Sequence, residues 1–304
     1  MRPLTDLELL EELEPTVAAN FDRHLAMVQE WMPHECVPWT RGRDFTGDGG
    51  LAWSPDQSQL SEAASAAFVV NLLTEDNLPS YHHELMVRYG GDSAWKAWVH
   101  RWTAEEARHA MSIRDYLLLS RAVDPAALER ERMATMEAGW SAEGRDILQS
   151  LVYVALQELV TRVAHQNTGR VANDPVADRL LTRIALDENL HMVFYRDLVS
   201  AALVLTPDQT LPAIASEVVR FKMPGAGVPG FLRRSVQIAD AGIYDVRLHR
   251  DEVLSPLILQ WQALTLRVTT HAAKEAQSTL ARHLDRLEQM AKRYEERRAA
   301  RVRG

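Results

Sequence analysis

Apolar residues recur along most of the chain with the 3.6-residue period of an α-helix, and runs with the two-residue alternation of a β-strand are few. Glycine and proline interrupt this periodicity at 33–58, 79–92, 139–144, 169–175 and 206–230. The pattern predicts helices near 4–30, 60–77, 81–89, 93–120, 125–137, 145–167, 175–204, 210–222, 231–241, 250–270 and 273–300. We therefore expect an all-α protein built on long helices.

Two segments differ from the regular helical pattern. Residues 33–58 are irregular but rich in aromatic side chains, so we expect them to pack over the helices as a cap. The segment 273–304 repeats apolar residues on one face and is strongly charged elsewhere, which predicts an amphipathic surface helix that frays from Arg297 onward. A chain of 304 residues can build one large core, and we predict a single domain spanning 1–304.

Composition and charge narrow the functional classes. The net charge of −8 disfavours nucleic acid as a partner. No run of about 18 uncharged apolar residues occurs, so no membrane span is expected. The acidic N-terminal segment lacks the apolar core and cleavage site of a secretory signal, which predicts a cytoplasmic protein. The single cysteine, Cys36, excludes an intrachain disulfide and a cysteine-rich metal site.

The sequence contains two Glu-x-x-His motifs, Glu106 to His109 and Glu188 to His191. On a helix, residues three apart point to nearly the same side, so the two side chains of each motif can bind one metal ion. Each motif also follows a further glutamate, Glu75 or Glu158, at a matched distance of about 30 residues. Carboxylate and imidazole at these spacings indicate a metal site built by packed helices.

The order Glu, Glu-x-x-His, Glu, Glu-x-x-His is the ligand set of ferritin-like di-iron bundles. We therefore predict a ferritin-like di-iron helical bundle with additional flanking helices, holding two Fe ions (Fe2+/Fe3+) per chain. Oxygen ligands with one imidazole per metal suit iron, or less well manganese, and fit zinc poorly. The predicted metal ligands are Glu75, Glu106, His109, Glu158, Glu188 and His191.

One ambiguity concerns the adjacent acids Glu105 and Glu106, since both could reach His109 on a helix. The angle around the helix does not decide between them. The Glu-x-x-His spacing, which recurs in both halves of the chain, favours Glu106 as the ligand.

Four segments resemble the successive site motifs of the soluble acyl-carrier-protein desaturases, in their actinobacterial branch. They are 74–81 (TEDNLPSY), 102–109 (WTAEEARH), 157–161 (QELVT) and 187–191 (DENLH). The resemblance runs from Leu4 to about Trp261. Family members often carry asparagine where this chain has Ala107, which is not a ligand position but could alter the surroundings of the ligands.

The resemblance implies an O2-dependent enzyme that removes two hydrogens from adjacent methylenes and leaves a cis double bond. It further implies an acyl chain carried on the phosphopantetheine arm of acyl carrier protein and lying in an apolar tunnel, a ferredoxin-type electron donor, and a homodimer. Carrier proteins are acidic, so docking needs a local cationic surface. The candidates are Lys222, Arg233 and Arg234, which flank a Gly/Pro loop.

The resemblance also implies roles for two residues near the ligands. Asp187 is expected to accept a hydrogen bond from a ligating histidine. Thr161 is expected to line the oxygen side of the cluster, although a helix threonine bonded to a backbone carbonyl is an equally good interpretation. Two other functions stay open: a di-iron hydroxylase or N-oxygenase acting on a carrier-bound substrate, and a non-catalytic ferritin-like iron-binding protein.

Overall fold

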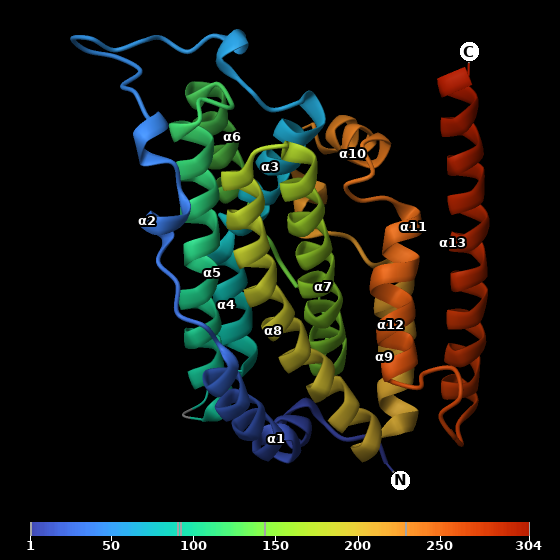
Figure 1. Cartoon of the computed structure of the whole chain (residues 1–304). Helices are drawn as coiled ribbons and strands as arrows, with labels where there is room; N and C mark the ends of the chain where they lie inside the picture. Colours follow the sequence, from blue (N-terminus) through green and yellow to red (C-terminus); the bar gives the residue numbers. More distant parts are fainter. Residues whose placement is uncertain (1, 90, 92, 143, 229, 304) are drawn as a thin grey trace.

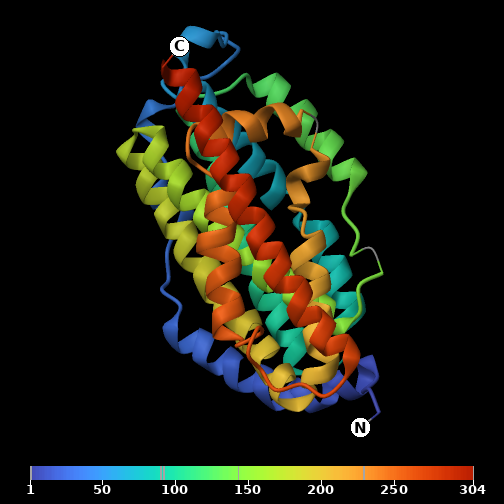
Figure 2. The same ribbon diagram turned by 90° about the vertical axis from the view of Figure 1, so that its right-hand side faces the viewer.

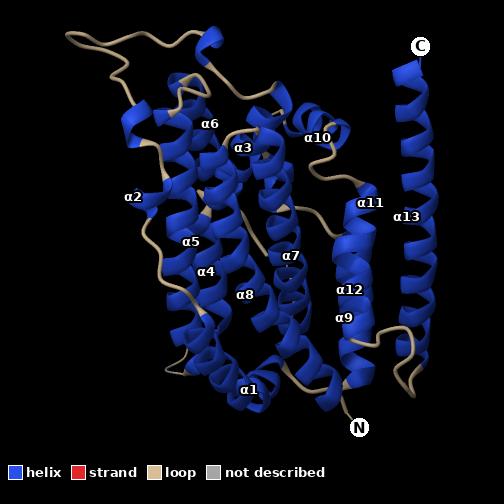
Figure 3. Ribbon diagram, in the orientation of Figure 1, coloured by secondary structure: helices blue, strands red, loops and turns tan. Residues whose placement is uncertain are grey.

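The computed structural model describes residues 2–89, 91, 93–142, 144–228 and 230–303. Helices and connecting loops make up this part of the chain, which contains no strand (Figure 3). Four long helices form the centre: α3 (Glu62–Glu75), α5 (Ala94–Leu119), α7 (Ile147–Ala172) and α8 (Pro175–Leu205). α3 packs on α5 and α7, and α8 packs on the same two helices, so the four close a ring. The prediction of an all-α, ferritin-like bundle is confirmed.

The remaining helices surround this ring (Figures 1 and 2). α1 (Asp6–Met27) crosses one end of the bundle and packs on α5 and α8, and α9 (Pro207–Arg220) packs on α7 and α8. α13 (His271–Arg303) runs along the outside against α9, and is helical beyond Arg297, where the sequence predicted fraying. The other elements are α2 (Pro33–Cys36), η1 (Trp39–Arg41), η2 (Pro55–Gln57), α4 (Leu78–Tyr89), α6 (Pro125–Ala138), η3 (Pro224–Gly227), α10 (Phe231–Asp240), α11 (Val246–Leu248), the π-helical turn η4 (His249–Leu254) and α12 (Ser255–Gln260).

Side-chain caps begin several of these helices where the sequence places a short polar residue. α7 starts with a capping box in which Asp146 and Gln149 satisfy each other's backbone N–H groups. α8 starts with Asp174 as the N-cap followed by Pro175, whose fixed φ suits the first helical turn. These caps define where the two most buried helices begin.

The two largest errors among the predicted helix boundaries both lie at C-terminal ends. α7 continues to Ala172 instead of ending near residue 167, because Gly169 serves helix packing and not termination. A Cβ atom at Gly169 would lie 3.1 Å from Cα of Asp178 on α8, so the glycine permits the close approach of the two helices. The helix predicted at 250–270 instead ends at Gln260, because Gln262 adopts a left-handed φ of 50° and the chain turns away.

The irregular segment 33–58 runs along α5 and over one end of the bundle, as Figure 1 shows. Arg121, which follows α5, holds part of this segment in place. Its guanidinium donates to Oε1 of Gln57 (2.6 Å) and to the carbonyl of Arg43 (3.0 Å), while its own carbonyl accepts from the indole of Trp53 (3.0 Å). One buried arginine thus attaches the cap to the helical core.

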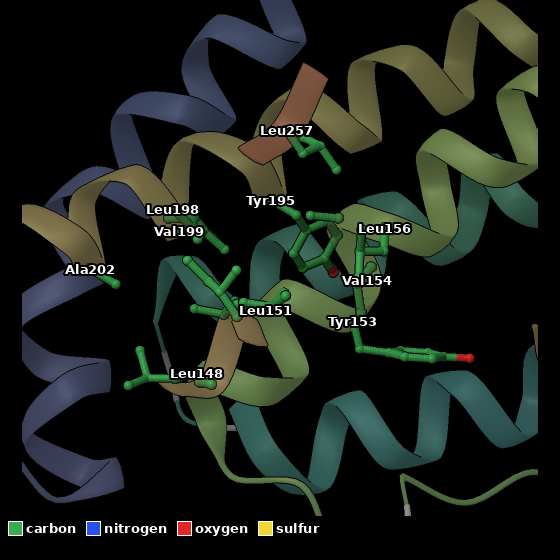
Figure 4. Packing of buried hydrophobic residues seen from close by; sticks show 14 of the residues in the cluster. Leu148, Leu151, Tyr153, Val154, Leu156, Tyr195, Leu198, Val199, Ala202 and Leu257 are labelled. Atoms are coloured by element: carbon green, nitrogen blue, oxygen red, sulfur yellow. The ribbon is translucent and has the colours of Figure 1, made fainter. Parts of the chain in front are cut away.

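α7 lies at the centre of the apolar core. Figure 4 shows Leu148, Leu151 and Leu156 of this helix among Leu198 and Val199 of α8 and further buried residues. By length and composition α7 alone among the described helices could cross a membrane, but 78% of its most apolar window is buried within the protein. The apolar character of α7 therefore follows from its position inside the bundle.

Candidate metal centre

The ring of four helices brings all six predicted ligands together in the interior. α3 ends with its glutamate, α7 carries another in its middle, and α5 and α8 each carry a Glu-x-x-His motif. All six side chains are buried: Glu75, Glu106, His109, Glu158, Glu188 and His191.

The ligand atoms form two overlapping groups, and within each group they lie within 4.8 Å of one another. One group consists of Glu75, Glu106, His109 and Glu188. The other consists of Glu106, Glu158, Glu188 and His191. Because Glu106 and Glu188 belong to both, the geometry suits two neighbouring metal ions with two shared carboxylates.

Both imidazoles direct Nδ1 toward this cluster of acids. Nδ1 of His109 is 3.2 Å from Oε1 of Glu188 and 3.5 Å from Oε2 of Glu106. Nδ1 of His191 is 2.8 Å from Oε1 of Glu106 and 3.7 Å from Oε2 of Glu158. The Nε2 atoms face outward, so each ring offers one nitrogen to a metal and one to a supporting residue.

Electrostatics indicate that the site is built for positive charge. Burial, followed by the charge of Glu188, raises the pKa of Glu106 and raises that of Glu158 well above its usual range. Several converging atoms make no hydrogen bond of suitable geometry within the described part of the chain, although some lie within 3.5 Å of one another: Glu106 Oε1, His109 Nδ1, Glu158 Oε2, Glu188 Oε1 and His191 Nδ1. Crowded carboxylates and unpaired buried polar atoms are costly unless cations pair with them. The residues therefore fit a pair of divalent ions.

Asp187 lies directly behind His109. Its Oδ2 atom is 3.5 Å from Nε2 of His109 and accepts hydrogen bonds from the indole of Trp31 (2.8 Å) and the guanidinium of Arg108 (3.2 Å), while Oδ1 pairs with Arg183. Burial opposes ionisation of Asp187, but the hydrogen bond with His109 and the charge of that ring, with the hydrogen bond from the Trp31 indole and the charge of His191, outweigh it and lower the pKa of Asp187 to about 2. The contact with a predicted ligand agrees with the role expected for Asp187.

Glu105 occupies the equivalent place behind His191, and the structure directs it away from His109. Its Oε2 atom is 2.9 Å from Nε2 of His191 and 2.9 Å from Nε2 of His24, and its Oε1 atom accepts from Nε of Arg101 at 2.6 Å. Glu106, by contrast, lies among the converging carboxylates. No sequence pattern indicated His24, since a lone histidine on an amphipathic helix is ordinarily a core or surface residue.

Two further polar side chains touch the glutamates. Oγ1 of Thr161 is 2.8 Å from Oε2 of Glu188 and 3.1 Å from the carbonyl of Gln157, so both expected interpretations of Thr161 have a contact that supports them. Nε2 of His165 is 2.8 Å from Oε1 of Glu75, a contact that the sequence did not indicate. Ala107 is exposed and points away from the ligands.

A ring of four helices that carries two Glu-x-x-His motifs and two further glutamates defines the chain as a ferritin-like carboxylate protein. The family model of the fatty acid desaturases matches residues 5–303, and the chain belongs to that family.

Relatives of this chain include desaturases from bacteria and plants. The acyl-[acyl-carrier-protein] desaturase DesA1 of Mycobacterium tuberculosis is 45% identical over 300 residues, which cover 96% of this chain and 89% of the relative. The chloroplastic acyl-[acyl-carrier-protein] desaturase 6 of Oryza sativa subsp. japonica is 30% identical, over 88% of this chain and 64% of the relative. The X-ray structure of the acyl-ACP desaturase DesA2 of M. tuberculosis matches with a TM-score of 0.73 and 32% identity, over 88% of this chain and 98% of that chain.

Proposed function

We propose that this protein introduces a cis double bond into a saturated acyl chain carried on acyl carrier protein, with two iron ions held by Glu75, Glu106, His109, Glu158, Glu188 and His191. The observation that supports this most directly is an apolar cavity beside the metal centre. The cavity has a volume of about 100 Å3 and is bordered by Glu75 and Thr161 at one side and by residues of α10 at the other.

The wall of this cavity suits a hydrocarbon chain. Side chains from α3, α7, α10 and the turn before α10 contribute to it, among them Val70, Val160, Met223 and Ile238. A saturated chain can be recognised only by shape and by exclusion of water, because it has no polar group to bind. When bound, the two iron ions would activate dioxygen for the removal of two hydrogens, and the protein would align the methylenes beside them.

A second, smaller pocket lies beside the N-terminal half of α7. It has a volume of about 30 Å3 and is lined by Tyr81, Trp140, Tyr153 and neighbouring residues. On α7, the residues of this pocket precede Glu158 and those of the larger cavity follow it. We propose that the methyl end of the acyl chain lies here, against the paired rings of Trp140 and Tyr153, whose centroids are 5.6 Å apart.

The decisive experiment supplies the iron-loaded protein with acyl carrier proteins of several chain lengths, a one-electron donor of the ferredoxin type and dioxygen. Mass spectrometry of the lipid should show the loss of two hydrogens. A gain of oxygen would instead indicate the hydroxylase alternative, and iron uptake without any product would indicate an iron-binding protein. The Ala164→Phe variant should keep its iron and lose activity because Ala164 borders the cavity, whereas Ala281→Phe on the exposed face of α13 should retain both.

The carrier protein would dock near α10. Arg233 is exposed there and Lys222 is exposed just before η3, whereas Arg234 already pairs with Glu131 at 2.7 Å. Charge reversal by Arg233→Glu should raise KM for acyl carrier protein and weaken its salt dependence. Lys274→Glu, in the first turn of α13, is the matched control, because α10 lies near the other end of that helix (Figure 1). An unchanged KM in both variants would place the docking surface elsewhere.

We further propose that the protein works in the cytoplasm as a homodimer. Large apolar side chains on the outer surfaces of the ligand helices, Met111 of α5 and Leu186 of α8, are half exposed and support a contact with a second copy. The mass of the native protein in solution at micromolar concentration tests this, and a monomeric mass would contradict it.

A further inference from the structure

An imidazole from the N-terminal helix α1 lies beside the metal centre although no sequence motif marks it. His24 is buried, and its Nε2 atom is 2.9 Å from Oε2 and 3.2 Å from Oε1 of Glu105. The same Oε2 atom is 2.9 Å from Nε2 of His191. One carboxylate oxygen of α5 therefore joins an imidazole of α1 to a predicted metal ligand of α8.

Glu105 determines which nitrogen of each ring carries a proton. An ionised carboxylate only accepts hydrogen bonds, so both imidazoles must donate to it through Nε2. For His191 this leaves Nδ1 as the nitrogen available to a metal, on the side where Glu106 and Glu158 lie. The orientation of Glu105 therefore controls the orientation of the ligating ring.

Glu105 has two supporting donors of different character. Arg101 donates to Oε1 at 2.6 Å, but its side chain is 37% exposed and can move with the carboxylate. His24 is held more firmly, because the indole of Trp98 packs edge-on against its ring with centroids 5.0 Å apart. The buried imidazole of His24 is therefore the less mobile of the two donors that hold Glu105 against the Nε2 atom of His191.

The atoms of His24, Glu105 and His191 also lie close enough together to suggest a third metal position. A metal there would need Nε2 of His191 as a ligand while Nδ1 serves the main cluster. The 2.9 Å contacts of both imidazoles with one carboxylate oxygen are ordinary charge-assisted hydrogen bonds. We propose that His24 is a positioning residue for His191, acting through Glu105, so that the N-terminal helix α1 sets the geometry of one of the two metal positions. This inference rests on the proposed metal site.

The test compares three substitutions of His24 in the iron-loaded protein. His24→Leu removes the donor, His24→Asn is too short to reach Glu105, and His24→Gln places an amide N–H near the position of Nε2. Loss of an outer hydrogen bond to a ligating histidine typically weakens metal binding by about 10- to 100-fold, and we expect an effect near the lower end for His24→Leu and His24→Asn. Mössbauer spectra should show one iron changed and the other unchanged, with His24→Gln close to the parent protein.

Val17→Ala is the matched control, because Val17 is a buried residue of α1 that loosens the helix packing when truncated. If Val17→Ala alters the cluster as much as His24→Leu, or if His24→Leu binds both irons like the parent protein, the inference is wrong. Should His24→Leu fail to fold, the iron affinities and Mössbauer spectra of His24→Gln and His24→Asn provide the same test. Equal values in these two variants would contradict the inference.

A metal-free measurement separates this inference from the proposed function. In the protein without iron, the Nε2–H resonance of His191 should exchange slowly with water in the parent and in His24→Gln, and rapidly in His24→Asn. If that difference is seen but the parent protein binds no iron pair, the proposed function fails and the positioning role of His24 stands. If the parent binds iron and the exchange rates are equal, only the positioning role fails.

Discussion

The two histidine-bearing halves of the metal centre have the same local sequence pattern, acid-Glu-x-x-His, but different supports. Asp187 behind His109 is held by the indole of Trp31 and by two arginines, Arg108 and Arg183. Glu105 behind His191 is held by one partly exposed arginine and by a buried imidazole from α1. Equal motifs on two helices therefore do not produce equal surroundings.

The supports also cross between the helices. The acid of α8 contacts the histidine of α5, and the acid of α5 contacts the histidine of α8. Each ligand helix therefore orients the imidazole of its neighbour. The remaining donors come from different segments, since Trp31 belongs to the connection after α1 and His24 to α1 itself. A substitution at Trp31 should therefore weaken mainly the metal position of His109, and a substitution at His24 mainly that of His191.

The largest effect should come from a residue that both halves share. Glu106→Ala removes a carboxylate that belongs to both groups of ligand atoms, so the variant should lose both irons and all activity. Glu105→Ala removes only a support and should keep both irons and fold normally, with a reduced rate. The iron content per chain and the absorption spectra of the two variants check these expectations. An intact cluster in Glu106→Ala together with a lost cluster in Glu105→Ala would reverse the assignment of ligand and support.

A smaller and one-sided effect is expected from the supporting acids. Asp187→Asn should weaken the metal position of His109, and Glu105→Gln that of His191, each by about 10- to 100-fold. Mössbauer spectra of the two variants should show opposite irons altered. The same iron changing in both would contradict the crossed arrangement of supports.

Trp31→Phe should have a weaker effect than His24→Leu. It removes one of the donors to Asp187 but leaves Arg108 and Arg183 in place. We expect a change in metal affinity of less than about tenfold, the low end for an outer hydrogen bond. Titration of the metal-free Trp31→Phe and His24→Leu proteins with Fe2+ measures the metal affinity of each variant. Equal losses in the two variants would show that the two halves are supported equally well.

A last prediction lies outside both halves of the metal centre and concerns the stability of the metal-free fold in mild acid. His249 is half-buried near His283, and desolvation, with the nearby His283, lowers its pKa from 6.5 to about 4. Because the folded state disfavours protonation, the stability contributed by neutral His249 is fully present above pH 6.5 and is lost as the pH falls toward 4. Between pH 7 and pH 5 the free energy of unfolding of the metal-free protein should fall by about 2 kcal/mol from this residue.

Urea unfolding at the two pH values measures this change. His249→Asn keeps an acceptor near the position of Nδ1 for the hydroxyl of Tyr244, which lies 2.8 Å from Nδ1 of His249, but cannot be protonated in this range. The variant should therefore lose less stability than the parent over the same interval. An identical loss would place the acid sensitivity elsewhere in the chain.

Local spacing in the sequence was enough to predict most of the helices and the six side chains that converge on the candidate metal centre. A three-residue separation on a helix determines that a glutamate and a histidine share a face, whatever the helix packs against. Capping residues such as Asp146 and Asp174 mark helix starts for a similarly local reason. The sequence therefore determined the helical class and the candidate ligands.

The tertiary structure alone decided which residues support those ligands and where packing overrides a local signal. His24 contacts Glu105 across 81 positions of the chain and His165 contacts Glu75 across 90, separations that no periodicity reports. Gly169 looked like a helix end, yet the close approach of α8 places it inside α7. Helix periodicity describes one helix at a time, whereas hydrogen bonds and close contacts between helices depend on how all of them pack together.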